Sequence, residues 1–446
     1  APQAWVLASI PQHQNDKFPE ASLVNSLVIG YNRALLSWYD VSPDFTDRRS
    51  QTRPNYMTLD DISNHLVRDV LETEIYPNRQ PFYNTPARLT VLNLAYFPNE
   101  RGPYNFDVQG ESGISAGIDE NGYLRNPNSR WAGIMRDLYL TDFESSNVEF
   151  IEFWLMDPFV YDSTSTGGDL YFNLGDISED ILKDGRKSFE NGIPYPDDPT
   201  KVDTTQWGIV SRKQMTTQNF DNNPEARKRQ DAGFDGILDS TERNFHQQYL
   251  QNIAQLYGTS SQAYLNAVND PSGDDFKYFL DPSYDEVRAN IIERYKKFNG
   301  TEGNSPLGEE NDLAYQAVSF QPDMEDINRD NTLDNYEAYY QYHIHLSPDE
   351  MEIGKNYIVN KVHSRVKLAN GNYGEVTWYQ FKIPIRKPDA VYGNINGFKS
   401  IRFMRIFLRN WQNPVVLRFA ELNLVREEWR VYQGLLIEGA EGSTTP

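Results

Sequence analysis

The stretch VEFIEFWLM, from Val148 to Met156, constrains the fold of this chain most strongly. Its residues are apolar on both alternating faces, apart from Glu149 and Glu152. Successive side chains of a β-strand point to opposite faces of the sheet, so a strand that is apolar on both faces is covered on both. The stretch therefore predicts a central strand in a layered, β-rich fold.

Four further stretches have the apolar character of strands: RLTVLNLAYFP (88–98), DLYFNLGDI (169–177), SIRFMRIFL (400–408) and VVLRFAELNLV (415–425). We expect the first to end at Pro98, because proline cannot donate to a strand ladder. Placed over SIRFMRIFL without gaps, NVEFIEFWL (147–155) matches apolar residues at most positions and a charge with a charge at two. We interpret the chain as mainly β, with two jelly-roll-like antiparallel β-sandwich units that flank an α-rich segment.

Two stretches between these units have helical periodicity. One places Phe245, Tyr249, Ile253 and Leu256 on a single stripe and is expected to end at Gly258. The other, residues 283–300, places Val287, Ile291, Tyr295 and Phe298 on one stripe and predicts a second helix that ends at Gly300. We therefore expect an N-terminal β-sandwich unit over 1–206, a helical insertion over 207–345, a C-terminal β-sandwich unit over 346–435 and a disordered tail over 436–446.

Composition excludes several classes of partner. A formal net charge of −22 repels the phosphate backbone of nucleic acids and anionic membrane surfaces. The absence of cysteine excludes disulfides and thiolate metal sites. No apolar run approaches the roughly 18 residues that a membrane-spanning helix needs, so we expect no direct membrane span in this chain.

The stretch DINRDNTLDNYE (326–337) has the spacing of an EF-hand calcium loop, which supplies oxygen ligands from positions 1, 3, 5, 7, 9 and 12. The residues at these positions are Asp326, Asn328, Asp330, Thr332 (through its carbonyl), Asp334 and Glu337. Position six is usually glycine because the backbone there has a positive φ. Here it is Asn331, the residue next most tolerant of that conformation. We expect a structural calcium ion in this loop.

A second stretch, DAGFDGILDSTE (231–242), repeats the register. Its ligands would be Asp231, Asp235, Ile237 (through its carbonyl), Asp239 and Glu242. Position three is Gly233, which has no side-chain oxygen, so water or another segment would have to complete the shell of this weaker site. Prolines upstream argue against full entering helices, and we expect each loop to be followed by one helix. The alternative for both loops is an Asx-rich turn without an ion.

The chain lacks the common catalytic motifs. It contains no GxSxG elbow, no phosphate-binding GxxxxGK loop, no HExxH and no dinucleotide fingerprint. Asp142, Glu144, Glu149 and Glu152 cluster in sequence and leave a glycoside-hydrolysing carboxylate pair as an alternative. Such clustering is expected by chance among 64 acidic residues, so we predict that the chain is not an enzyme.

Two histidines lie close together in YQYHIHL (340–346). A strand here would point Tyr342, Ile344 and Leu346 into the core and place Gln341, His343 and His345 on the opposite face. Two such histidines bind zinc when a third ligand joins them, but a solvated strand face is commoner. We assign them no role from the sequence.

Six longer stretches together resemble a known family. They are NERGPYNFD, RWAGIMRDL, FESSNVEFIEFWLMDPF, GGDLYFNLGDISEDILKDGRKSFENG, RYKKFNGTEGNSP and DINRDNTLDNYEAYYQY. They resemble the SprA/Sov family, the giant outer-membrane translocon of the type IX secretion system in Bacteroidota. The resemblance extends across most of the chain, which shows no succession of barrel strands and so resembles a soluble insertion of the translocon.

The resemblance implies a role in protein transport and gliding motility, as a cap or insertion domain at the extracellular face of the outer membrane. A periplasmic position is the alternative. The implied partners are the rest of the translocon barrel, a PorV-like shuttle protein, a plug protein and secreted client proteins. The resemblance implies no catalytic residue. We expect aromatic residues such as Tyr104, Trp131 and Trp154 to fill cores instead of gripping clients. The alternative function is a calcium-dependent carbohydrate-binding β-sandwich module.

Overall fold

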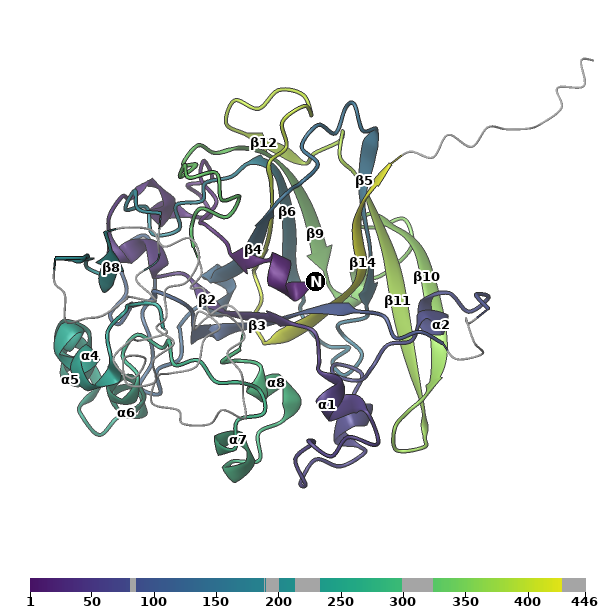
Figure 1. Ribbon diagram of the computed structural model, residues 1–446, viewed down its shortest axis with the longest axis horizontal. Coiled ribbons are helices and arrows are strands. Elements are labelled where there is room, and N and C mark those ends of the chain that lie inside the picture. The colour runs from purple at the N-terminus through teal and green to yellow at the C-terminus, as the bar shows by residue number, and fades with distance from the viewer. Residues whose placement is uncertain (81–85, 188, 190–199, 213–232, 299–323, 427–446) are drawn as a thin grey trace, which may run out of the picture.

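Two six-stranded antiparallel sheets pack face to face in the computed structural model (Figure 1). The structure describes residues 1–80, 86–187, 189, 200–212, 233–298 and 324–426. The prediction of a mainly β chain with a helical insertion is confirmed.

The first sheet, sheet A, contains in spatial order β1 (Val6–Leu7), β4 (Trp131–Asp137), β13 (Phe403–Arg409), β6 (Gly168–Asp176), β9 (Ala338–Leu346) and β12 (Ala390–Tyr392). The second, sheet B, contains β10 (Ile358–Lys367), β11 (Tyr373–Pro384), β5 (Val148–Met156), β14 (Val415–Arg426), β3 (Val91–Arg101) and β2 (Ala34–Tyr39). A separate pair is formed by β7 (Val202–Thr204) and β8 (Ile209–Ser211).

Strand β5 is central and covered on both faces, as its sequence predicts. It pairs with β11 on one side and with β14 on the other. On its inner face, the Phe153 ring stacks on Phe172 of sheet A at a centroid distance of 5.3 Å. On its outer face, Trp154 and Met156 are buried in a second cluster with Ile75. A polar residue at these positions would therefore be desolvated on either face.

Each sheet takes strands from both the first and the last part of the chain. In sheet A, β13 lies between β4 and β6, and in sheet B, β14 lies between β5 and β3. The segments 1–206 and 346–435, expected as successive units, thus contribute to the same two sheets. The physical reason is that strands such as β13 and β14 are apolar on both faces and find both neighbours in strands formed by earlier residues.

Strand β3 continues past Pro98 to Arg101, so the expected end at this proline is wrong. The pairing of β3 with β2 shifts register here, from Leu35 opposite Phe97 to Ala34 opposite Arg101. Pro98 lies in this bulge, where its missing N–H removes no ladder hydrogen bond.

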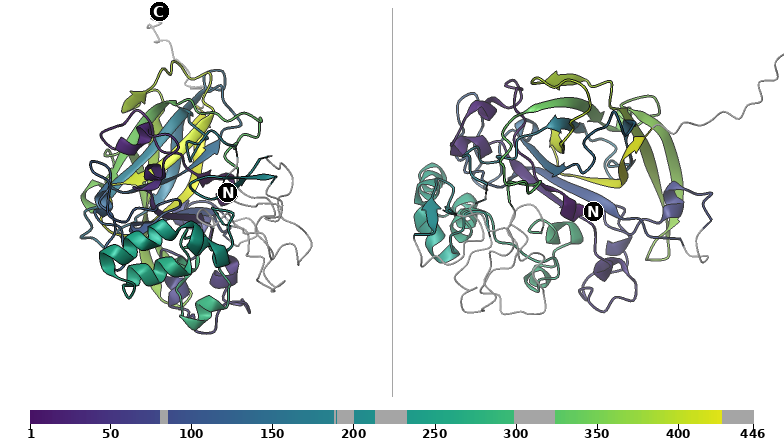
Figure 2. Two further views of the ribbon diagram at one scale, coloured as in Figure 1. Left: turned by 90° about the vertical axis from the view of Figure 1, so that its left-hand side faces the viewer. Right: turned by 45° about the horizontal axis from the view of Figure 1, so that its top comes forward.

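The helices are short and lie mostly to one side of the sandwich (Figure 1, Figure 2). The α-helices are α1 (Pro43–Thr46), α2 (Glu72–Ile75), α4 (Asp239–Phe245), α5 (Gln247–Tyr257), α6 (Gln262–Asn269), α7 (Ser283–Glu286) and α8 (Ile291–Arg294). The 3-10 helices are Pro2–Ala4, Pro19–Ser22, Leu27–Gly30, Asp61–Ser63, Pro127–Ser129 and Pro348–Glu350. No helix in these described ranges is long and apolar enough to span a bilayer.

The first predicted helix corresponds to α4 and α5, which ends at Gly258 with φ of +83°. The second is wrong as a continuous helix, because α7 and α8 are separate. Arg288 has a φ of +51°, which interrupts a right-handed helix, and Val287 is 74% exposed instead of facing the core. Asn290 then starts α8 with a reciprocal capping box to Glu293.

Candidate metal centre

In the loop that begins at Asp326, backbone N–H groups donate hydrogen bonds to side-chain oxygens of the same loop. Asp326 is 1% exposed, and its carboxylate accepts hydrogen bonds from the backbone N–H groups of Asp330 (3.2 Å) and Asn331 (3.0 Å). Asn331 has a φ of +67°, the left-handed conformation predicted for position six. The first half of the loop therefore has the backbone turn that an EF-hand spacing requires.

The next two predicted ligands continue this winding. Asn328 Oδ1 accepts from the Asp330 N–H at 2.9 Å, and Asp330 Oδ1 accepts from the Thr332 N–H at 2.7 Å. Asp330 and Thr332 lie at the exposed surface, so an ion reaching them would keep contact with solvent.

The last two predicted ligands are turned towards arginines. Asp334 Oδ2 lies 2.6 Å from Arg402 Nη1, and the Glu337 carboxylate pairs with Arg405. Among the described residues, no closely spaced group of three or more His, Asp or Glu ligand atoms includes a carboxylate of the 326–337 loop. The loop therefore holds Asp326, Asn328 and Asp330 in one turn and directs Asp334 and Glu337 elsewhere.

This loop leads into strand β9 and not into the helix expected after it. From Tyr342 the burial alternates, with Tyr342, Ile344 and Leu346 buried and His343 and His345 partly exposed, as predicted for the strand. Gln341, on the same face as the histidines, is 3% exposed because β12 pairs with β9 beside it. The pairing of β9 with β6 accounts for the extended backbone.

Glu179, which was not predicted from the sequence, lies outside the 326 loop and holds it through hydrogen bonds. Its carboxylate accepts from the N–H groups of Ile327 (2.9 Å), Asn328 (3.2 Å) and Asp334 (3.1 Å). Burial, together with repulsion from Asp334, raises the pKa of Glu179 to about 7 despite these hydrogen bonds.

A second loop, which begins at Asp180, repeats the same turn. The Asp180 carboxylate accepts from the N–H groups of Asp184 and Gly185, both at 3.1 Å, just as Asp326 does from Asp330 and Asn331. Gly185 has a φ of +75°. The sequence signal was present, because EDILKDG (179–185) and EDINRDN (325–331) share four identities and the two left-handed positions.

The 180 and 326 loops pack against each other. Glu325 Oε1 accepts from the Leu182 N–H at 3.4 Å, and the Glu325 N–H donates to the Lys187 carbonyl at 3.2 Å. Ligand oxygens of Asp180, Asp184 and Glu325 all lie within 4.8 Å of one another. Burial raises the pKa of both Asp180 and Asp184. A bound cation would favour the ionised form of these carboxylates.

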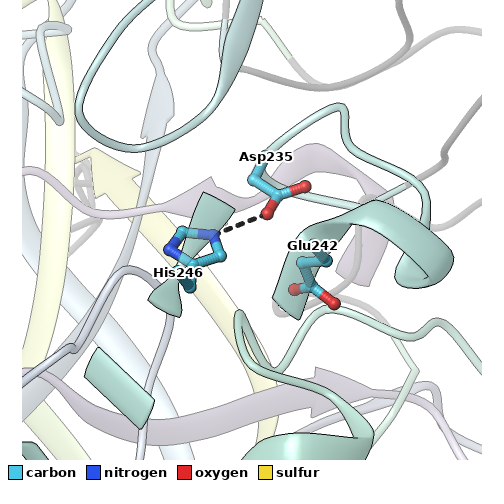
Figure 3. Close-up of side chains that lie close together, drawn as sticks. All are labelled: Asp235, Glu242 and His246. Carbon is cyan, nitrogen blue, oxygen red and sulfur yellow. Dashed lines mark hydrogen bonds and ion pairs between the residues drawn. The ribbon is translucent and has the colours of Figure 1, made fainter. Parts of the chain in front are cut away.

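The other predicted loop is described from Gly233 onwards, and Asp231 lies outside the described residues. Asp235 is 1% exposed; Oδ1 accepts from the Ile237 N–H at 2.8 Å, and Oδ2 lies 2.8 Å from His246 Nε2 (Figure 3). Position six, Gly236, has a φ of +67°. Asp239 begins helix α4, and its side chain is outside the description.

Glu242 lies on α4 near Asp235 and His246 (Figure 3). Burial raises the pKa of Glu242, and the neighbouring Asp274 carboxylate raises it further. Burial also lowers the pKa of His246 to about 3, with the Arg101 charge acting in the same direction, so this imidazole is neutral at pH 7. Neutral imidazole and carboxylate are both metal-ligand forms.

Asp274, also missed from the sequence, occupies the space that a side chain at position three would take. A Cβ added to Gly233 would overlap its carboxylate. Asp274 Oδ2 accepts from the N–H groups of Phe234 and Asp235, the latter at 3.1 Å. Ligand atoms of Glu242, Asp270 and Asp274 lie within 4.8 Å of one another. A segment distant in sequence thus brings carboxylates to the position where the loop lacks one.

A family model described as motility related/secretion protein, SprA_N, matches residues 248–445 of the chain. The matched stretch, a little under half of the chain, is therefore similar to this family of motility and secretion proteins. The matched part of the chain contains the 326 loop, Asp274 and strands β9 to β14, and it begins just after Glu242 and His246. No curated protein matches the chain.

The four acids that cluster in sequence, Asp142, Glu144, Glu149 and Glu152, have structural partners. Glu149 pairs with Arg386 at 2.9 Å, and Glu152 accepts from Gln380 at 2.9 Å across strands β5 and β11. Asp142 and Glu144 accept from backbone N–H groups at 2.9 Å and 3.0 Å. These contacts give each carboxylate a role in a turn or a sheet.

The aromatic residues expected in cores are there. Tyr104, Trp131 and Trp154 are 4%, 0% and 3% exposed. Tyr104 and Trp131 pack in the main core, and Trp154 packs in the cluster on the outer face of sheet B.

Proposed function

We propose that this chain is a structural and protein-interaction domain of a giant outer-membrane protein-export channel, placed as a cap or insertion at its extracellular face and stabilised by calcium. The family match supports the secretion role. The observation that carries the calcium role is the packed pair of acidic loops that begin at Asp180 and Asp326, wound in the same way.

The loop pair is attached to sheet A at three places. The 180 loop follows the end of β6, the 326 loop precedes β9, and Arg402, directly before β13, contacts both Asp176 (2.7 Å) and Asp334 (2.6 Å). An ion held by the loops would therefore cross-link segments that lead into three adjacent strands. Carboxylate, amide and carbonyl oxygens are the ligands that calcium prefers, and sites of this kind contribute to folding stability.

A thermal melt of the purified chain in EDTA and in excess CaCl2 tests the calcium role. We expect the melting temperature, Tm, to rise with calcium, and the rise to be reduced when Asp180→Asn and Asp326→Asn are combined. The matched control is Glu352→Gln, at an exposed acid that contacts Lys355. An unchanged Tm in EDTA, with no calcium in the purified protein by elemental analysis, would refute the proposal, and a rise retained in the double variant would remove the loop pair as its source.

Cysteine labelling in cells tests the extracellular position, because this chain contains no cysteine. Tyr139 is fully exposed, and Tyr139→Cys in the full-length protein provides a single added thiol. We expect a membrane-impermeant maleimide to label it in intact cells, with the unmodified protein as background. Labelling that requires a permeabilised outer membrane would instead place the domain on the periplasmic side.

A glycan array separates the export role from the carbohydrate-binding alternative. We expect no selective binding in the presence of calcium. Reproducible binding to one glycan class, abolished by EDTA, would favour the carbohydrate-binding module.

A further inference from the structure

One imidazole and two carboxylates meet where the segment before α4 packs against that helix (Figure 3). Glu242 lies on α4, and His246 directly follows the helix and donates its backbone N–H to the Glu242 carbonyl at 2.9 Å. This helical spacing of four residues places the two side chains on one face. Asp235 lies in the segment that leads into α4, and one ligand atom from each of the three residues lies within 4.8 Å of the other two.

The imidazole of His246 is held in one orientation. Its ring stacks on Phe106 at a centroid distance of 4.7 Å, and Phe245 contacts it edge to face. Its Nε2 lies 2.8 Å from Asp235 Oδ2, while Asp235 Oδ1 accepts from the Ile237 N–H at 2.8 Å. The nitrogen is therefore directed at the carboxylates before any ion binds.

Glu242 brings a carboxylate with one oxygen still available. Its Oε1 accepts from the backbone N–H of Ser272 at 2.6 Å and from the Ser272 hydroxyl. No residue in the described part of the chain donates a hydrogen bond to Oε2, although the residue is only 2% exposed. A buried carboxylate oxygen without a donor is unfavourable unless a cation compensates it.

The surrounding charges also favour a cation. Ligand atoms of Asp270 and Asp274 lie within 4.8 Å of one from Glu242. Asp270 has a counter-charge in Lys297, at 3.0 Å, but no arginine or lysine of the described residues forms an ion pair with Glu242 or Asp274. A divalent ion beside Glu242 would supply the missing positive charge.

We propose that Asp235, Glu242 and His246 form a buried binding site for a divalent transition-metal ion of the zinc type. The sequence predicts calcium for Asp235 and Glu242, but calcium selects six to eight oxygen ligands, whereas an imidazole with two carboxylates suits four-coordinate Zn²⁺. Binding replaces the hydrogen bond between His246 and Asp235 and requires the imidazole proton to be on Nδ1, so that the Nε2 lone pair faces the ion. The fourth position is left for water or for Asp274. The ion would fasten the segment before α4 to that helix.

The test is isothermal titration of ZnCl2 into the purified chain, in a chelator-free buffer with excess CaCl2. We expect one zinc ion per chain, and His246→Gln and Glu242→Gln each to weaken binding by about tenfold or more. The control His363→Gln, at a 62% exposed histidine on β10, should leave the affinity unchanged. The site shares no residue with the loops that begin at Asp180 and Asp326, so zinc binding should also persist when Asp180→Asn and Asp326→Asn are combined.

A second readout uses the wild-type chain, because substitutions at buried residues can also unfold the protein. X-ray absorption of the zinc-loaded chain should show one imidazole nitrogen among oxygen ligands. Circular dichroism shows whether each variant is folded. Zinc binding that a folded His246→Gln variant retains in full, displacement of zinc by calcium, or a ligand shell of oxygen alone would each overturn the proposal. Absence of zinc binding to the folded wild-type chain would overturn it too, leaving the three side chains as a buried hydrogen-bond network.

Discussion

Glu337 and Arg405 form an ion pair in which neither side chain is exposed to solvent. Arg405 Nη1 lies 2.7 Å from Glu337 Oε1, and Nη2 lies 3.1 Å from Oε2. The Glu337 carboxylate also accepts from the N–H groups of Gln12 and Ser178, so one pair connects β13, the start of β9 and two loops. Such a pair fixes the arrangement more than it adds stability, because both charges have lost their water.

Removing one partner leaves a buried charge without its counter-charge. We expect Arg405→Ala to lower the free energy of unfolding by about 3–5 kcal/mol. The control Arg386→Ala breaks the partly exposed pair with Glu149 and should cost about 1 kcal/mol or less. Urea unfolding measures both, and a loss for Arg405→Ala no greater than that of the control would contradict the prediction.

A substitution at Gly233 tests whether Asp274 contributes to a cation site in the second predicted loop, residues 231–242. In Gly233→Ala the new Cβ would overlap the Asp274 carboxylate, so we expect lower stability and a smaller rise of Tm with zinc. Gly113→Ala is the comparison, since a Cβ there meets nothing within 4 Å and only the φ of +75° is unfavourable, at about 1–2 kcal/mol. If Gly233→Ala keeps the full zinc response, Asp274 is not part of that loop's site.

The metal-free chain should become less stable as pH rises from about 5 to 8. Glu179 binds its proton more tightly in the folded chain, with a pKa of about 7, than at its ordinary value of 4.5, so the folded state carries more protons in this window. The stability that protonated Glu179 contributes below its ordinary pKa of 4.5 is therefore lost as the pH rises through its folded-state pKa of about 7. Burial also raises the pKa values of Glu242 and Asp274, so these two groups act in the same direction. Thermal melts in EDTA at several pH values measure the slope.

Calcium should flatten that slope, because a cation favours the ionised carboxylates. Glu179→Gln should also flatten it in EDTA, since the variant has no proton to lose at this position. A slope that Glu179→Gln leaves unchanged would show that other groups cause it.

The left-handed residue of the 326 loop gives a backbone test. Asn331→Gly should be neutral or slightly stabilising, whereas Asn331→Val should cost about 1–2 kcal/mol, since β-branched residues avoid the observed φ of +67°. Chemical denaturation of the two variants side by side provides the comparison. Equal stability of the two would mean that the loop relaxes to another conformation.

Local features of the fold were predictable from sequence because they depend on neighbours in the chain. The nine residues of β5 carry their own burial pattern, and Asn331 carries its own conformational tolerance. The 180 loop could also have been found by aligning it with the 326 loop. These signals need no knowledge of tertiary structure.

Long-range partners could not be predicted in the same way. Nothing in the spacing of 326–337 indicates that Glu337 pairs with Arg405, 68 residues away, or that Asp274 fills the space beside Gly233. In the same way, Asp169 meets His345 through the strand order of sheet A. Each depends on which strands pair, a choice made by packing across the whole sandwich.

The placement of β13 and β14 between earlier strands has a consequence for biosynthesis. Until the ribosome has released residues 403–426, β4, β6, β5 and β3 each have an open edge, and neither layer can close. The nascent chain must therefore remain protected from aggregation until nearly all of the described residues have emerged. Folding then completes when β13 pairs with β4 and β6 and β14 pairs with β5 and β3.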